Sequence, residues 1–272
     1  MQYIANTEAD KKEMLKAIGV SSFESLIANI PQSLRKFKLE IPAGISELEL
    51  DRAFDEIGAL NKNFKHHISY IGGGSYDHFI PAVVDRLAHR GEFMTAYTPY
   101  QGEASQGTLQ AIYEYQSLIC ELTGMDCSNA SMYDGASSLA EGALVALRFS
   151  GRKKILVPTN VHPEYREVLK TYLSFIDAEI IEITTKDGVV DETFLEKSLD
   201  EQVAAVILQQ PNFFGILENA PRITELAHRT GALLIACVNP LSLGIIEPPG
   251  EYGADIALGE GQPLGNAVSF GG

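Results

Sequence analysis

Five short apolar segments in the second half of the chain constrain its fold more than any other feature. They are KKILVPT, AEIIEIT, AAVILQQP, GALLIACVNP and GADIALGE, which begin at residues 153, 178, 204, 231 and 253. Each is rich in β-branched residues and is bounded by glycine, proline or polar residues, as strands are. Helical stretches such as PEYREVLKTYLSFI and NAPRITELAHRTG lie between several of them, and in the second Asn219 and Gly231 suit the two helix ends. This alternation predicts an α/β fold whose mainly parallel sheet is covered on both faces.

The first part of the chain has a helical period instead. Thr7 with Asp10 forms a capping-box pattern, and Gly19 suits the end of that helix. A second helix is expected to begin at Ser22 and to run to Ile30, before Pro31, and SELELDRAFDEIGALNKN predicts a third. We therefore expect a helical N-terminal segment over residues 1–65 and an α/β large domain over residues 66–272.

The acidic composition excludes several classes of function. Thirty-six acidic residues stand against 21 basic ones, giving a net charge of −15. Nucleic acids and anionic membrane surfaces are bound by lysine and arginine, so neither is an expected partner. No apolar run approaches the ~18 residues of a membrane span, and the N-terminus has no signal-peptide pattern, which favours a cytoplasmic protein.

Cysteine and histidine do not form a metal-binding pattern. The three cysteines, Cys120, Cys127 and Cys237, have spacings that match no zinc or redox motif, so we expect buried thiols in a reducing compartment. The six histidines form no paired-ligand spacing, and no metal is expected.

The glycine-rich segment ISYIGGGSYDHFIP, residues 68–81, is the first candidate for chemistry. Three successive glycines allow close approach of the backbone, and Ser75 and His78 then offer polar groups. The alternative is a simple glycine turn before a helix that starts near Pro81.

The second candidate is TAYTPYQGEASQG, residues 95–107, which precedes a helix expected to start near Gly107. It concentrates polar and aromatic groups, a composition common in loops that contact ligands. These residues are Tyr97, Tyr100, Gln101, Glu103, Ser105 and Gln106. The alternative is a solvated loop whose tyrosines pack on the core.

The third candidate is the turn before the helix in NASMYDGASSLAEGALVALR, residues 129–148. Gly135, Ala136 and Ser137 would present free N–H groups at a helix N-terminus, which suits a phosphate. An ordinary helix start has the same appearance, and Asp134 and Glu141 would repel an anion if they pointed inward.

The order of these segments resembles pyridoxal-phosphate enzymes of the aminotransferase-like fold, fold type I. In that fold the phosphate lies on the first helix, an aspartate on a later strand pairs with the pyridinium nitrogen, and a lysine on the following loop forms the Schiff base. Four stretches are more specific and resemble the glycine decarboxylase P-protein family, in particular the N-terminal-half subunit (subunit 1) of its two-subunit form. They are IGGGSYDHFIPAVVDRL, EFMTAYTPYQGEASQGTLQAIYEYQSLICELTGMD, NASMYDGASSLAEGALVALR and GADIALGEGQPLG.

The resemblance implies an activity that is divided between subunits. The P-protein decarboxylates glycine with pyridoxal phosphate and passes the aminomethyl group to the lipoyl arm of H-protein. Subunit 2 carries the cofactor lysine, and the family suggests an α2β2 assembly. The sequence ends at AVSFGG, where Val268 to Phe270 predict a further strand with nothing after it to complete a layer. We therefore expect an N-terminal fragment that stops before the C-terminal small domain.

This chain departs from a working cofactor site as that division implies. Lys197 is its last lysine, and Gln262 and Pro263 stand where the reactive lysine should lie. Cys237, Val238 and Asn239 stand where the nitrogen-pairing aspartate should lie, and Asp255 is a poor substitute. We therefore expect a cofactor-site architecture that has lost its covalent chemistry, with vestigial positions at Gly135, Ala136, Ser137, Asn239 and Gln262.

By analogy with the family, the first two candidate segments are expected to form the wall of an active site shared with subunit 2. The wall candidates are Ser75, His78, Tyr97, Tyr100, Gln101, Glu103, Ser105 and Gln106. Tyrosine and glutamine could hold a substrate carboxylate, and Glu103 or His78 could transfer a proton. Two alternatives remain open, a non-catalytic scaffold subunit and a self-sufficient lyase or aminotransferase of the same fold.

Overall fold

The computed structural model describes residues 5–35, 40–63, 66–68, 70, 72–74, 76, 78–94 and 98–268. The chain divides into two compact units, Met1–His66 and His67–Gly272. Among the described residues, no helix is both long enough and apolar enough to cross a membrane.

The described residues of the first unit form four helices: α1 (Glu8–Ile18), α2 (Phe23–Leu26), α3 (Gln32–Arg35) and α4 (Glu47–Gly58). Local sequence explains where they begin, because Thr7 and Ser46 each form a complete capping box. The second helix is shorter than its sequence predicted. Ser22 caps it, but it ends at Leu26 because residues 27–30 form turns. No described residue of these four helices is buried.

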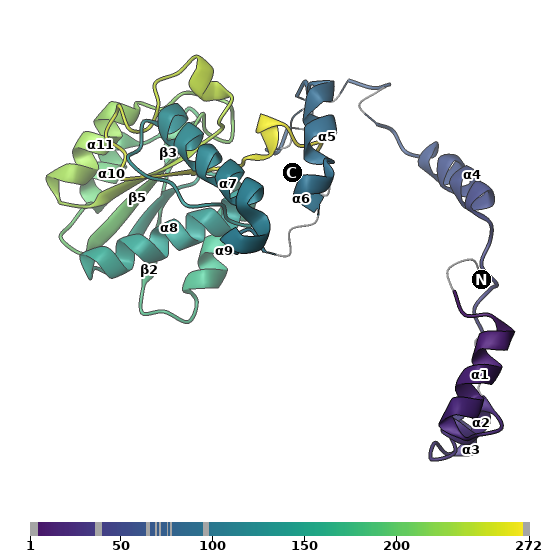
Figure 1. Ribbon diagram of the computed structural model, residues 1–272. Helices are drawn as coiled ribbons and strands as arrows, with labels where there is room; N and C mark the ends of the chain where they lie inside the picture. Colours follow the sequence, from purple (N-terminus) through teal and green to yellow (C-terminus); the bar gives the residue numbers. More distant parts are fainter. Residues whose placement is uncertain are drawn as a thin grey trace. The chain divides into compact units, whose positions relative to one another are not determined.

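The second unit is an α/β domain built on a five-stranded parallel sheet (Figure 1). Its strands are β1 (Lys154–Pro158), β2 (Glu179–Ile183), β5 (Val203–Gln210), β6 (Leu233–Val238) and β7 (Ile256–Gly259), in the order β2-β1-β5-β6-β7. All five expected strands are present, and their pairing is parallel throughout. A small antiparallel pair, β3 (Thr185–Lys186) and β4 (Val189–Val190), stands apart from this sheet.

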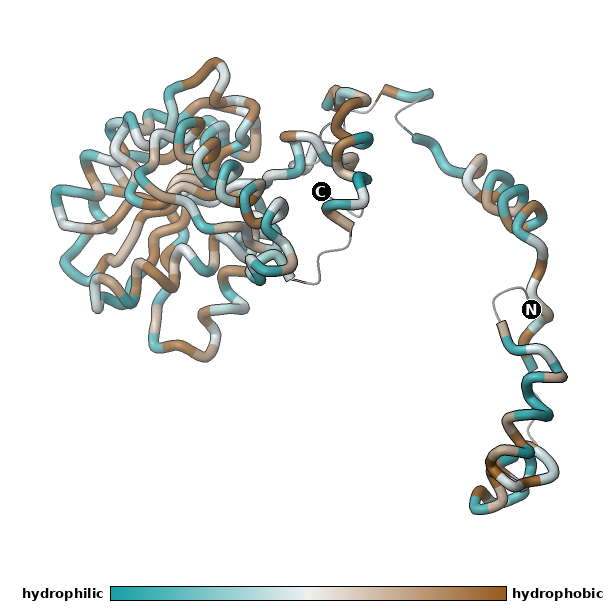
Figure 2. The backbone as a smooth tube through the Cα atoms, in the orientation of Figure 1, coloured by the Kyte–Doolittle hydropathy of each residue, from teal (hydrophilic) through white to brown (hydrophobic). Residues whose placement is uncertain are grey.

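Helices cover both faces of the sheet (Figure 1). On one face α8 (Gly135–Ser150) and α9 (Pro163–Leu173) pack on alternate strand residues such as Ile155, Ile207 and Ile235. On the other face α10 (Glu192–Ser198) and α11 (Ala220–Arg229) pack on the intervening residues, such as Leu156 and Leu234. This two-sided burial explains why the central strands β5 and β6 are largely hydrophobic (Figure 2), whereas the edge strand β2 carries the exposed Glu179 and Glu182.

The remaining described elements are α5 (Ala82–Ala88), α6 (Gly91–Met94), α7 (Gly102–Thr123) and two 3-10 turns, η1 (Ser242–Gly244) and η2 (Gln262–Leu264). The sequence placed the start of α7 near Gly107, but the helix begins at Gly102, with an irregular residue at Ser105. Asn219 stands at the start of α11 as expected, but its side chain makes no capping bond and donates to Glu192 Oε1 at 3.3 Å instead. Of the three cysteines, only Cys237 is buried, so the expectation that all three are buried was wrong.

Candidate functional site

The carboxyl ends of the parallel strands form the natural site edge of this fold. His162 follows β1, Cys237 lies near the end of β6, and Glu260 directly follows β7. Asp255, the weak candidate for pairing with a cofactor nitrogen, lies at the opposite end of β7. It accepts hydrogen bonds from His228 Nε2 at 2.8 Å and from Leu234 N at 2.7 Å, so its carboxylate binds groups at the amino ends of the strands.

Glu260 binds the first turn of α8. Its Oε1 accepts a hydrogen bond from Gly135 N at 2.6 Å and another from the Tyr165 hydroxyl at 3.1 Å. A Cβ added at Gly135 would lie 2.3 Å from the Tyr165 hydroxyl and 2.9 Å from Glu260 Oε1. Only glycine therefore allows these two side chains to reach the helix N-terminus.

A second carboxylate completes this helix start. Asp134 is the N-cap residue of α8, and its Oδ1 accepts from Ser137 N at 2.7 Å and from Ser137 Oγ at 2.6 Å. These bonds from Ser137 hold the pKa of Asp134 below its usual value. In the part of the chain that the structure describes, neither Asp134 nor Glu260 forms an ion pair with a basic side chain.

The side chains around Glu260 are kept neutral by burial. Burial raises the pKa of Tyr165 far above its ordinary value, and the neighbouring Glu260 carboxylate adds to this effect. Burial raises the pKa of the Cys237 thiol to about 12, again with a contribution from Glu260. Close to Glu260 there are therefore a neutral phenol and a neutral thiol, and no described cationic side chain is bonded to Glu260 or Asp134.

His162 links Tyr165, the neighbour of Glu260, to the glycine-rich segment. Its Nδ1 accepts from Glu164 N at 3.2 Å at the start of α9, so Nε2 carries the proton and donates to Gly73 O at 2.8 Å. Its ring stacks on Tyr165, with 4.8 Å between centroids, and meets the edge of Phe213 at 5.0 Å. The path from Glu260 through Tyr165 and His162 thus ends at the glycine turn.

The glycine-rich segment itself is a turn before α5. Gly72, Gly73 and Gly74 all have positive φ, between 67° and 90°, a conformation that other residues rarely adopt. His78 follows it, and its buried Nε2 has no hydrogen-bond partner among the described residues. Ser75 lies outside the described residues.

The second candidate segment forms the start of α7. Tyr100, Gln101, Glu103 and Gln106 are exposed, and Gln101 is the N-cap residue without a side-chain capping bond. Ser105 is the exception, because it is 4% exposed and its hydroxyl has no partner in the described part of the chain. Tyr97 lies outside the described residues. Among the described residues no hydrogen bond or ion pair joins this segment to the glycine turn.

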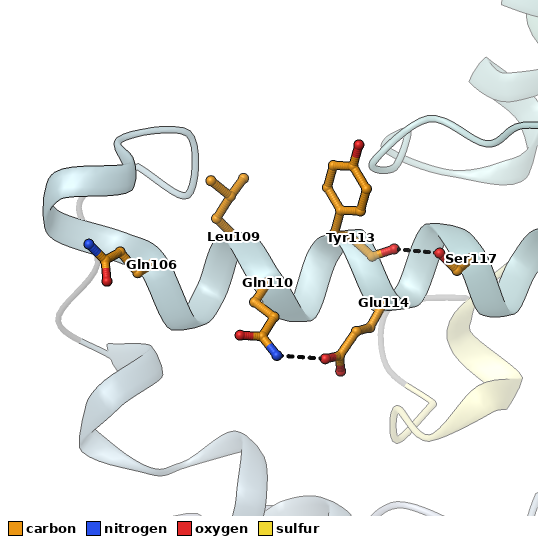
Figure 3. A pocket seen from close by; sticks show the side chains of 6 residues that line it. All are labelled: Gln106, Leu109, Gln110, Tyr113, Glu114 and Ser117. Carbon is orange, nitrogen blue, oxygen red and sulfur yellow. Dashed lines mark hydrogen bonds between the residues drawn. The ribbon is translucent and has the colours of Figure 1, made fainter.

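A shallow groove runs along one face of α7 (Figure 3). Gln106, Leu109, Gln110, Tyr113, Glu114 and Ser117 line it. Within it Gln110 donates to Glu114 at 2.8 Å, and Ser117 Oγ donates to the Tyr113 carbonyl at 3.1 Å. Of the wall candidates that the structure describes, only Gln106 lines the groove.

The vestigial positions separate into two groups. Gly135, Ala136 and Ser137 are buried at the start of α8, beside Glu260. The other two serve their own turns instead: Asn239 Oδ1 accepts from Leu241 N at 3.0 Å, and Gln262 Nε2 donates to Asn266 O at 2.5 Å.

Sequence reasoning missed several residues of this region. Tyr165, His162, Phe213 and Glu260 were assigned no role. The one available signal was position, since His162 and Tyr165 directly follow a predicted strand. No group of three or more His, Cys, Asp or Glu side chains among the described residues could hold a metal ion.

Comparison with known proteins identifies the family. The family model described as "Glycine cleavage system P-protein" matches residues 1–272. Two relatives named "Probable glycine dehydrogenase (decarboxylating) subunit 1" match the whole chain. The protein from Desulfitobacterium hafniense is 56% identical, and that from Chlorobium luteolum is 52% identical. The chain spans 61% and 62% of the length of these relatives.

Solved structures agree with this match. The crystal structure of a glycine decarboxylase (P-protein) of the glycine cleavage system, in inhibitor-bound form, is similar with a TM-score of 0.87 and 46% identity. That match covers 100% of this chain and 61% of the other. "SspA in complex with cysteine" is similar in fold alone, with a TM-score of 0.58 and 14% identity over 71% of this chain and 56% of the other. The fold is that of the pyridoxal-phosphate-dependent fold-type-I enzymes, and the chain belongs to the glycine cleavage system P-protein family.

Proposed function

We propose that this chain is part of subunit 1 of a glycine decarboxylase and completes an active site whose pyridoxal phosphate is held by subunit 2. One observation carries the proposal. The chain belongs to this family, yet the carboxylate of Glu260 binds the start of α8, where the fold would bind the phosphate of the cofactor. The sequence after Lys197 contains no lysine, so residues 198–272 have no side-chain amine that could form a Schiff base with the cofactor. The residues present do not fit the cofactor.

The two wall segments support a role at a shared site. His78 Nε2 and the Ser105 hydroxyl are buried without a described partner, and such groups are costly unless another molecule binds them. Tyr100, Gln101 and Gln106 carry donors suited to a substrate carboxylate. Glu103 in the second wall segment, or His78 in the first, would transfer a proton. In this proposal glycine is the substrate and the lipoyl arm of H-protein takes the aminomethyl group.

The N-terminal helices support assembly with a partner. Phe54 is 65% exposed and Ile57 is 59% exposed on α4, and similar apolar side chains are exposed on α1 and α2. Exposed apolar faces of this kind mark protein–protein contacts. We propose that these helices contribute to a cytoplasmic assembly with two copies of each subunit.

The test is glycine–bicarbonate exchange, measured with and without subunit 2 and H-protein. The chain alone should be inactive, and activity should appear only in the complex. Replacing Tyr100 and Glu103, as Tyr100→Phe and Glu103→Gln, should lower exchange in the complex. Tyr172→Phe and Glu121→Gln, which change exposed residues of α9 and α7, are the matched controls.

Two outcomes would favour the alternatives. Unchanged turnover after replacement of Tyr97, Tyr100 and Glu103 together would indicate a scaffold subunit. An adduct of pyridoxal phosphate that borohydride traps on this chain would indicate a self-sufficient enzyme.

A further inference from the structure

The start of α8 combines features that normally bind an external anion. The helix has 16 residues, its first N–H groups lack intrahelical partners, and its dipole favours negative charge at this end. In this chain a carboxylate from a segment 125 residues away already lies there, because Glu260 Oε1 accepts from Gly135 N at 2.6 Å.

We propose that Glu260 is an internal anion that closes the start of α8 to a phosphate group. Its bonds to Gly135 and Tyr165 form a structural contact, called the joint below, in the region where the fold would hold its cofactor. The joint holds the loop after β7 against α8 and α9. It continues through the ring contacts of Tyr165 and His162 to the Gly73 carbonyl, so it also positions the glycine turn.

Space and charge both support this closure. The Tyr165 hydroxyl and Glu260 Oε1 would lie within 3 Å of a Cβ on Gly135, so protein atoms occupy the position directly in front of the helix. A phosphate would also meet two carboxylates, since Asp134 caps the same turn and keeps a lowered pKa. Two donors of the first turn, Gly135 N and Ser137 N, are therefore already bonded, and the local charge repels a second anion.

The first experiment tests closure on the complete chain. Inorganic phosphate and pyridoxal phosphate are titrated separately and followed by phosphorus NMR linewidth, cofactor absorbance and the thermal midpoint. The wild-type chain should respond to neither compound. A wild-type response that shifts the Gly135 amide signal, or that is unchanged in Glu260→Ala, would overturn the proposal.

The second experiment tests the joint by chemical rescue. Glu260→Ala should lower the thermal midpoint, and formate or acetate should restore part of the loss in this variant but not in the wild type. Glu201→Ala, which removes an exposed glutamate from a turn, is the matched control and should show neither effect. A Glu260→Ala midpoint equal to that of the wild type would overturn the proposal.

Glu260→Gln keeps the test decisive if the alanine variant does not fold. It retains an oxygen that accepts from Gly135 N but lacks the charge, so exchange of the Gly135 amide should become about two- to fivefold faster, the range expected for losing a charge at a helix N-terminus. Hydrogen exchange at residues 72–74 should also become faster. Unchanged exchange at both places would overturn the proposal, and no readout depends on glycine decarboxylation.

Discussion

The buried carboxylate of Glu218 provides the sharpest test of how this domain is stabilised. Glu218 is 8% exposed and accepts only from N–H groups: Asn160 Nδ2 at 2.5 Å, Asn212 Nδ2 at 2.7 Å and Val190 N at 3.0 Å. Each asparagine uses its second amide hydrogen on the Gly188 carbonyl. The cluster thus has three donors that need an acceptor, and no described cationic side chain pairs with Glu218.

The substitution Glu218→Gln should destabilise the domain although it conserves shape. One Gln oxygen can accept from both asparagines, but its NH2 group then faces Val190 N, donor against donor. The reverse orientation places the NH2 group against the two asparagines. A buried donor without an acceptor costs about 1–3 kcal/mol, and the remaining bonds lose their charge assistance, about 1 kcal/mol each, partly offset because a neutral group is cheaper to bury. We expect a net loss of about 2–4 kcal/mol.

The measurement is urea unfolding at pH 7, followed by far-UV circular dichroism. Glu218→Gln should lower the transition midpoint without changing the slope, and Glu218→Ala should lower it further because all three donors lose their acceptor. Glu225→Gln is the control, since Glu225 is an exposed residue of α11 whose pairs with Arg222 and Arg229 lie at the surface. A Glu218→Gln protein within about 0.5 kcal/mol of the wild type would refute the account of this cluster.

Three further predictions concern helix capping, core packing and backbone contact. Asp134→Ala should lower the free energy of unfolding by about 1 kcal/mol, because the N-cap is lost. Since the pKa of Asp134 is lowered in the folded state, this stability difference from the wild type should be complete above pH 3.8 and disappear as the pH falls through the folded pKa. A stability difference that stays constant down to low pH would contradict this. Leu139→Ala, at a fully buried α8 position, should cost about 2–5 kcal/mol in urea unfolding, and a loss below 1 kcal/mol would contradict the core packing. Gly250→Ala should lower the thermal midpoint, because the added Cβ would lie 2.0 Å from the Gly124 carbonyl oxygen. Gly107→Ala should raise the midpoint slightly, because no atom lies within 4 Å of the added Cβ. Equal effects of the two substitutions would contradict the contact between Gly250 and Gly124.

Elements fixed by short-range patterns agreed with the sequence. The central strands β1, β5 and β6 were recognisable because both faces of the sheet are buried there, which makes these strands largely apolar. The start of α1 agreed because a capping box needs only residues three apart. The fold class and the family resemblance rested on such contiguous segments, and the comparisons confirmed both.

Disagreements arose where local patterns were overruled. The amphipathic pattern after Ser22 predicted a helix to Ile30, but α2 ends at Leu26, and apolar spacing alone does not stabilise a short helix without a surface to bury against. The start of α7 was placed five residues late, near Gly107, although the helix begins at Gly102. The chain tolerates it there in the first turn, followed by the irregular conformation at Ser105.

The sequence by itself determined the strands, most helix starts, the family and the absence of a lysine after Lys197. Only the tertiary structure decided what Glu260 does, because its partner Gly135 is 125 residues away and lies on a different element. The same holds for the bond between His162 and Gly73, and for Glu218 with its asparagines. Hydrogen bonds between distant segments depend on how strands and helices are brought together, and no local spacing encodes that arrangement.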